Sequence, residues 1–182
     1  GYSAAIRAAQ LGLRAALVEK EERLGGICLN WGCIPTKALL KQAEVYRLLQ
    51  RAEEYGFTVG QGGFDWRKVI QRSRQVSERL SKGVDYLMKK NKVEVVRGRG
   101  RVVAGPKVEV RDAKGAVVRT LGAKNVVLAT GSRPQSLPAV QPEGKQIITS
   151  REAMVLEALP KSLAIIGAGA IGLLTLAALR LI

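Results

Sequence analysis

The sequence predicts an α/β fold with a small antiparallel β insert. Short apolar runs alternate with longer segments in which apolar residues keep helical spacing, and a glycine-rich segment follows the last apolar run. Strands separated by helices indicate a parallel sheet. The composition is that of a globular protein, because 47% of the 182 residues are hydrophobic and 25% are charged.

The first third of the chain predicts a helix, a strand, a loop and a second helix, over residues 1–14, 15–19, 24–32 and 36–55. Gly12 is a suitable stop for the first helix, and Pro35 suits the first turn of the second. The strand is an apolar run that ends at Glu19, as a buried parallel strand does. The loop carries three glycines and no periodicity.

A long helix is predicted from Asp65, an N-cap candidate, to about Lys90. Its apolar stripe consists of Val69, Val76, Leu80, Val84, Leu87 and Met88. Four short β-rich stretches follow and predict an antiparallel meander, namely residues 93–96, 102–103, 108–110 and 117–120. The rest of the chain predicts a buried strand, a linker and a second strand, at residues 125–129, 134–144 and 163–166.

The composition excludes several classes of site. The chain has no histidine, which removes Ser-His and Cys-His catalytic pairs and histidine-containing metal sites. Its two cysteines cannot supply a four-ligand zinc site, so no metal is expected. No apolar run reaches the roughly 20 residues of a membrane span, no secretory signal is visible, and a cytoplasmic location is expected.

The net charge of +15 raises the alternative of a basic module that binds nucleic acid or an anionic surface. Twelve basic and three acidic residues lie between Arg67 and Arg101. Tyr86 is the one aromatic residue among them, whereas nucleic-acid binding would call for several aromatic side chains that stack on bases. A solvated helix face is therefore favoured, and attraction of acidic partner domains is a further possibility.

Cys28 and Cys33 enclose four residues just before the helix that Pro35 begins. The N-terminus of a helix carries partial positive charge, which favours a thiolate and lowers a thiol pKa. Lys37, four residues beyond Cys33, adds a cation nearby. Spacing alone leaves two unrelated cysteines as the simpler interpretation, but their surroundings favour a redox pair.

The segment from Gly25 to Leu40, GGICLNWGCIPTKALL, resembles the redox-active segment of the flavin-dependent pyridine nucleotide–disulfide oxidoreductases. Its continuation after Cys33 is most similar to the branch that acts on dihydrolipoamide. The resemblance implies that Cys28 exchanges disulfides with substrate, that Cys33 is the thiolate beside the flavin, and that Lys37 lies near the flavin. A glutathione-type or mercuric-type reductase of the same family remains the alternative.

The resemblance also implies two nucleotide sites, for FAD and for NAD. For FAD, Gly1 would be the last glycine of a first fingerprint and Glu19 the acid on a ribose hydroxyl. The other implied FAD contacts are Lys20, Gly25, Gly26, Cys28, Lys37, Gly100, Thr130, Gly131 and Ser132. For NAD, the fingerprint 167–172 would bind the pyrophosphate through Gly167, Gly169, Ile171 and Gly172.

The family implies an organisation in two Rossmann-like domains. Residues 1–144 would be most of an FAD-binding domain that lacks its first strand, and residues 145–182 the beginning of an NAD(P)-binding domain. Leu174 stands where the family usually has a glutamate, and the choice between NAD and NADP stays open. The implied partners are a lipoyl carrier domain and a second copy of the chain, whose far C-terminal histidine would act as the base. We expect the 182 residues to be a fragment and inactive by themselves.

Overall fold

The computed structural model describes residues 1–60, 62–135 and 137–180. The chain forms two compact units. The first comprises residues 1–26 and 80–131, and the second comprises residues 27–79 and those from 132 onward. The long helix α4 (Trp66–Lys90) contributes its last part to the first unit and its first part to the second.

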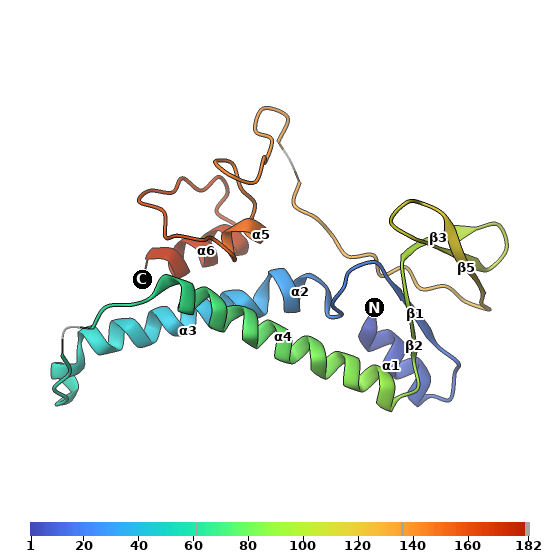
Figure 1. Ribbon diagram of the computed structural model, residues 1–182, viewed down its shortest axis with the longest axis horizontal. Coiled ribbons are helices and arrows are strands. Elements are labelled where there is room, and N and C mark those ends of the chain that lie inside the picture. The colour runs from blue at the N-terminus through green and yellow to red at the C-terminus, as the bar shows by residue number, and fades with distance from the viewer. Residues whose placement is uncertain (61, 136, 181–182) are drawn as a thin grey trace. The chain divides into compact units, whose positions relative to one another are not determined.

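The first unit contains a parallel strand pair. Helix α1 (Tyr2–Gln10) is followed by β1 (Ala16–Glu19), which pairs in parallel with β2 (Glu94–Arg97), with Leu17 opposite Val95 (Figure 1). The helix and strand expected before residue 20 are therefore confirmed, and Gly12 has a left-handed φ of 81° just after the helix.

The antiparallel meander has three strands and not the four predicted. Strands β3 (Arg99–Val103), β4 (Lys107–Arg111) and β5 (Val117–Gly122) pair in this order. The prediction that residues 93–96 belong to it is wrong, because these residues form most of β2, which pairs with β1. A run of valines predicts an extended backbone, but it does not specify which neighbouring strand supplies the hydrogen bonds.

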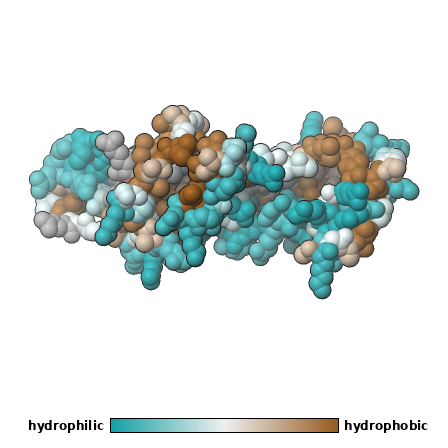
Figure 2. Space-filling model, turned by 90° about the horizontal axis from the view of Figure 1, so that it is seen from above, coloured by the Kyte–Doolittle hydropathy of each residue, from teal (hydrophilic) through white to brown (hydrophobic). Residues whose placement is uncertain are grey.

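Two predicted strands are absent from the described residues. Residues 125–129 and 163–166 form no strand ladder. Val127 and Leu128 are each 74% exposed and are therefore part of the apolar surface. Figure 2 draws hydrophobic residues in brown and shows that such residues reach the surface. An apolar run becomes a strand when a neighbouring backbone pairs with it, and among the described residues none pairs with either run.

The second unit is helical. Its elements are α2 (Gly26–Trp31), α3 (Cys33–Gln50), the 3₁₀ helix η1 (Ala52–Tyr55), the start of α4, α5 (Ser150–Ala153) and α6 (Ala170–Arg180). The helix predicted over 36–55 is confirmed as α3 over residues 36–50, and it begins three residues earlier. The predicted end is wrong, because α3 stops at Gln50 and residues 52–55 form the separate 3₁₀ helix η1. The loop predicted over 24–32 is wrong for α2, a six-residue helix that depends on tertiary contacts.

Helix α4 has a buried face that differs from its predicted stripe. Val84 and Met88 are buried, but Leu80 and Leu87 are exposed. Three serines are buried instead, Ser73, Ser77 and Ser81. The Ser73 hydroxyl donates to the Pro35 carbonyl at 3.4 Å, and the Ser81 hydroxyl donates to that of Leu24 at 2.8 Å. Because a serine side chain is small, the backbone at Pro35 and at Leu24 can approach α4 closely. The serine hydroxyls then supply hydrogen bonds to the carbonyls of these two residues.

The second unit is held by an apolar cluster of Leu39, Met154 and Ala178, with Leu40, Val69 and Ile70 packed against it. The indole of Trp66 donates to the Leu156 carbonyl at 2.8 Å. The linker predicted at 134–144 contains turns and an isolated bridge between Leu137 and Val140, while residue 136 lies outside the described residues. No described helix is both long and apolar enough to cross a bilayer.

Gly98 permits the corner between β2 and β3. Its φ is 144°, and a Cβ there would lie 2.5 Å from Val110 Cγ1 and 2.7 Å from the Arg111 carbonyl oxygen. We expect Gly98→Ala to lower the free energy of unfolding by about 1–3 kcal/mol, because it adds both backbone strain and a steric overlap. Urea unfolding followed by circular dichroism measures this loss.

The matched control is Gly122→Ala at the end of β5, where a Cβ would meet open space. We expect this variant to stay within about 0.5 kcal/mol of the parent chain. Equal stability of the two variants would show that the corner at Gly98 does not depend on glycine.

Candidate functional site

Cys28 and Cys33 lie on two consecutive helices. Cys28 is the third residue of α2, and Cys33 is the first residue of α3. Gly32 separates the helices, and a Cβ at this position would lie 3.2 Å from the Ile27 carbonyl oxygen, closer than most side chains allow. Both cysteines are exposed thiols. The chain therefore brings two reactive sulfurs to one accessible turn.

Cys33 lies close enough to Cys28 to be the main influence on the pKa of that thiol. Hydrogen bonding with the Cys33 side chain, burial and the charge of Cys33 raise the pKa of Cys28, while the Cys33 backbone and the charge of Lys37 oppose the rise. The expectation of a lowered thiol pKa is therefore wrong for Cys28.

Cys33 lies at the N-terminus of a long helix. It is the first residue of the 18-residue α3, whose first turn contains no acidic side chain. The partial positive charge at a helix N-terminus stabilises an anion there. Lys37 lies one turn further along α3 and acts on Cys28 through its charge. The predicted cysteines and lysine are thus brought together.

Contacts that the sequence did not predict hold the turn between α2 and α3. The Arg74 guanidinium donates to the Asn30 carbonyl at 2.7 Å and lies over the Trp31 ring, with its Cζ 5.8 Å from the ring centroid. Arg151 lies over the same ring at 4.0 Å. The run Thr149-Ser150-Arg151-Glu152 is a capping-box pattern that could have predicted α5. Nothing in the local sequence predicts that Arg151 of this helix lies over Trp31.

In the first unit, several of the predicted FAD contacts lie around β1. A Cβ on Gly1 would lie 3.7 Å from both Leu17 and Ala129, so the absence of a side chain leaves a small cradle where α1 begins. Glu19 ends β1, and its carboxylate accepts the Glu21 amide at 2.9 Å. Gly100 packs against β1, with Val18 3.3 Å from the position of a Cβ.

The remaining predicted FAD contacts lie on turns. Lys20 pairs with Glu21 at 3.5 Å and is exposed. Three glycines have left-handed φ values, 114° at Gly25, 65° at Gly26 and 73° at Gly131. Thr130 and Gly131 belong to the first unit and follow directly after Ala129, whereas Ser132 belongs to the second. A glycine cradle at a helix start fits the diphosphate of a dinucleotide.

The second fingerprint forms a tight turn before α6. Gly167 has a φ of 111°, and a Cβ on Gly172 would overlap the Gly167 carbonyl oxygen. Ile171 is exposed on the first turn, where α6 has no acidic side chain. These features fit a pyrophosphate, although the strand expected before the turn is absent. Among the described residues, no group of three or more acidic or cysteine side chains is arranged to hold a metal ion.

Comparisons with known proteins agree with this geometry. The whole chain, residues 1–182, matches the family described as pyridine nucleotide-disulphide oxidoreductase. A protein of Chlorobaculum tepidum named dihydrolipoyl dehydrogenase is 52% identical over 172 residues, which cover 94% of this chain and 36% of that protein. A protein of the same name from Zymomonas mobilis is 51% identical over 173 residues, which cover 95% of this chain and 37% of that protein.

A solved structure shares the architecture. The crystal structure of LpdA from Mycobacterium tuberculosis superposes with a TM-score of 0.78 at 26% identity, over 88% of this chain and 36% of that chain. The chain spans little more than a third of the length of the curated relatives that it matches. With its cysteine pair at the start of α3 and a family match along its full length, the chain belongs to the pyridine nucleotide-disulphide oxidoreductases.

Proposed function

We propose that the whole protein transfers electrons from dihydrolipoamide to NAD⁺ through a Cys28–Cys33 disulfide and FAD. The observation that carries this proposal is the placement of two exposed thiols at one turn, with Cys28 on α2 and Cys33 at the start of α3, where the Cys33 side chain acts on Cys28. Two cysteines that lie together at one accessible turn are suited to forming a disulfide. The relatives named dihydrolipoyl dehydrogenase support the choice of substrate.

The proposed exchange begins with the disulfide form of the pair. One thiolate of the substrate attacks the Cys28 sulfur, the Cys28–Cys33 bond breaks, and Cys33 leaves as a thiolate. The second substrate sulfur then attacks the substrate's sulfur in the mixed disulfide and releases Cys28. The substrate loses two electrons and two protons and becomes a cyclic disulfide, while the cysteine pair takes up the two electrons.

Two features support Cys28 as the sulfur that is attacked. A leaving thiolate is favoured where its charge is stabilised, and Cys33 lies at the N-terminus of α3. The raised pKa of Cys28 means that this residue takes up a proton readily once it is released. The order agrees with the roles that the family resemblance implies.

FAD, when bound, supplies the two-electron acceptor that restores the disulfide and passes the electrons to NAD⁺. The residues proposed to contact it are those that the family resemblance implies, namely Gly1, Glu19, Lys20, Gly25, Gly26, Cys28, Lys37, Gly100, Thr130, Gly131 and Ser132. The turn formed by Gly167, Gly169, Ile171 and Gly172 is proposed to bind the NAD pyrophosphate.

A homodimer, a lipoyl carrier domain as partner and a cytoplasmic location belong to the same proposal. A pair that cycles between dithiol and disulfide suits a reducing compartment. The domain boundary between residues 144 and 145 stays a prediction. A reductase for glutathione or mercuric ion is the second candidate, since the cysteine spacing would serve those substrates equally, and no observation favours it over dihydrolipoamide.

The first test measures flavin binding and exchange by the chain itself. We expect added FAD to lose fluorescence on binding and the oxidised chain to accept electrons from dihydrolipoamide, with both cysteines becoming available to alkylation. Cys33→Ser is expected to bind FAD equally well but to form no internal disulfide. A whole protein that binds no FAD, or a chain whose two cysteines stay separate after oxidation, would contradict the proposal.

The second test concerns complete turnover. The chain holds no histidine to deprotonate the substrate dithiol. We expect the purified 182-residue chain with FAD to form no NADH from dihydrolipoamide and NAD⁺, whereas the whole protein should do so. Absorbance at the NADH band follows the reaction, and turnover by the chain alone would refute the need for a base from outside it.

The third test concerns the proton on Cys28. Because its raised pKa shifts thiolate formation to higher pH, removing the hydrogen bond in Cys33→Ala should lower the pKa and speed Cys28 alkylation severalfold at pH 8. Lys37→Gln should raise the pKa further and slow the reaction. Fragmentation mass spectrometry after timed reaction with iodoacetamide locates the label.

The control is Lys41→Gln, one turn beyond Lys37 on α3, where the lysine pairs with Glu44 at 3.0 Å. This variant should alkylate at the rate of the parent chain. If Cys33→Ala alkylates no faster than the parent, the Cys33 side chain does not raise the pKa of Cys28.

A further inference from the structure

We infer that Arg151 is a positioning residue for the cysteine pair, and that it acts by stacking on Trp31 at the turn between Cys28 and Cys33. The inference rests on the disulfide exchange proposed above and adds to it a residue more than 100 positions away in the sequence. Trp31 ends α2, and it is followed by Gly32 and then by Cys33 at the start of α3.

The contact itself is close. The Arg151 Cζ lies 4.0 Å from the centroid of the Trp31 ring, well inside the roughly 6 Å over which a guanidinium and an indole attract each other. Arg74 lies over the same ring at 5.8 Å and also donates to the Asn30 carbonyl at 2.7 Å. The last two residues of α2 are therefore held from α5 and from α4.

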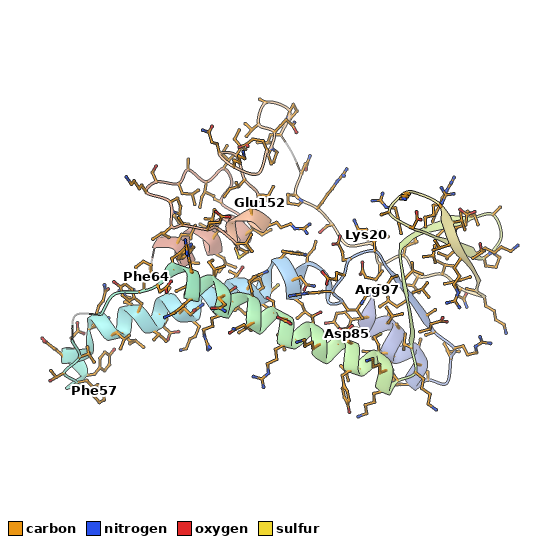
Figure 3. The ribbon with its side chains drawn as sticks, in the orientation of Figure 1. Lys20, Phe57, Phe64, Asp85, Arg97 and Glu152 are labelled. Carbon is orange, nitrogen blue, oxygen red and sulfur yellow. The ribbon has the colours of Figure 1, made fainter. Side chains whose placement is uncertain are left out.

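The backbone of Arg151 is fixed by its own surroundings. Thr149 caps α5 by accepting the Arg151 amide at 3.2 Å, and the Thr149 amide donates to Glu152 at 2.8 Å. Glu152 lies on α5 (Figure 3). Just beyond α5, the buried Met154 sulfur accepts the Thr36 hydroxyl at 3.5 Å. Helix α5 is thus attached to α3, and it presents the Arg151 side chain at a fixed place.

Positioning matters because the two cysteines lie on different helices. Gly32, which joins the helices, has no side chain to cap α3 or restrict the turn. How often the two sulfurs meet depends on the relative freedom of α2 and α3, and restricting that freedom raises the effective concentration of one thiol at the other. A stack that holds Trp31 therefore favours the disulfide over the open dithiol.

The charge of Arg151 is not what acts on the sulfurs. The cation whose charge affects Cys28 is Lys37, on α3. A residue that acts by geometry shifts the equilibrium between dithiol and disulfide, whereas a residue that only supports the fold changes stability without shifting that equilibrium. Measuring the equilibrium between dithiol and disulfide therefore distinguishes the two roles of Arg151.

The experiment measures the equilibrium of the Cys28–Cys33 pair in defined mixtures of reduced and oxidised glutathione, with acid quenching, alkylation and mass spectrometry. We expect Arg151→Leu to shift the equilibrium about 2- to 5-fold toward the dithiol, as loss of an exposed cation–π contact would. Arg151→Lys should recover much of the shift, because an ammonium group also binds an aromatic face.

Variants of the ring provide the second arm. Trp31→Leu should match Arg151→Leu, Trp31→Phe should retain part of the effect, and the double variant should lie no further from the parent than either single change. Arg47→Leu, which removes an exposed arginine near the end of α3, is the matched control and should leave the equilibrium unchanged. Circular dichroism confirms that each variant is folded. Where a leucine variant does not fold, Arg151→Lys and Trp31→Phe are compared with the parent instead.

Two failures are distinguishable. If the parent forms the disulfide and Arg151→Leu has the same equilibrium as the parent and Arg47→Leu, the positioning role is overturned while the proposed exchange stands. If the parent forms no Cys28–Cys33 disulfide in any mixture, the proposed function fails, and the inference built on it fails too.

Discussion

The placement of Cys28 and Cys33 at one turn is the constraint on which the proposed chemistry depends. It arises because α2 ends at Trp31 and α3 begins at Cys33, with Gly32 as the single residue between them. A Cβ at Gly32 would crowd the Ile27 carbonyl oxygen, so a glycine suits this turn. The same arrangement gives the two sulfurs different environments, since Cys28 lies within α2 and has a raised pKa, whereas Cys33 lies at the N-terminus of α3.

Small residues set the spacing between elements within each unit. Ser73 and Ser81 let α4 approach the backbone at Pro35 and Leu24, and their hydroxyls donate to the carbonyls that they cover. At the corner between β2 and β3, Gly98 likewise allows a close approach, because a side chain there would overlap Val110 and Arg111. Larger side chains at these places would push the elements apart, and buried carbonyls would lose their partners.

Sequence reasoning succeeded where the signal was local. Helical spacing predicted α3 and α4, and the apolar run before Glu19 predicted β1. It failed at α2, whose six residues are held by Arg74, and at the run 125–129, which has no paired neighbour among the described residues. The cysteine pair was found from its spacing and its flanking residues, whereas the proton on Cys28 was not, because a pKa depends on groups that only the fold brings near.

The sequence by itself determined the family, the helices α1, α3 and α4, the strand β1, and the identity of the two cysteines and Lys37. These follow from patterns that extend over a few turns of chain, where neighbours in sequence are neighbours in space. The tertiary structure decided which strands pair, which face of α4 is buried, and that Arg151 and Arg74 lie over Trp31. Those outcomes depend on surfaces brought together from distant parts of the chain, and local propensity carries no information about such encounters.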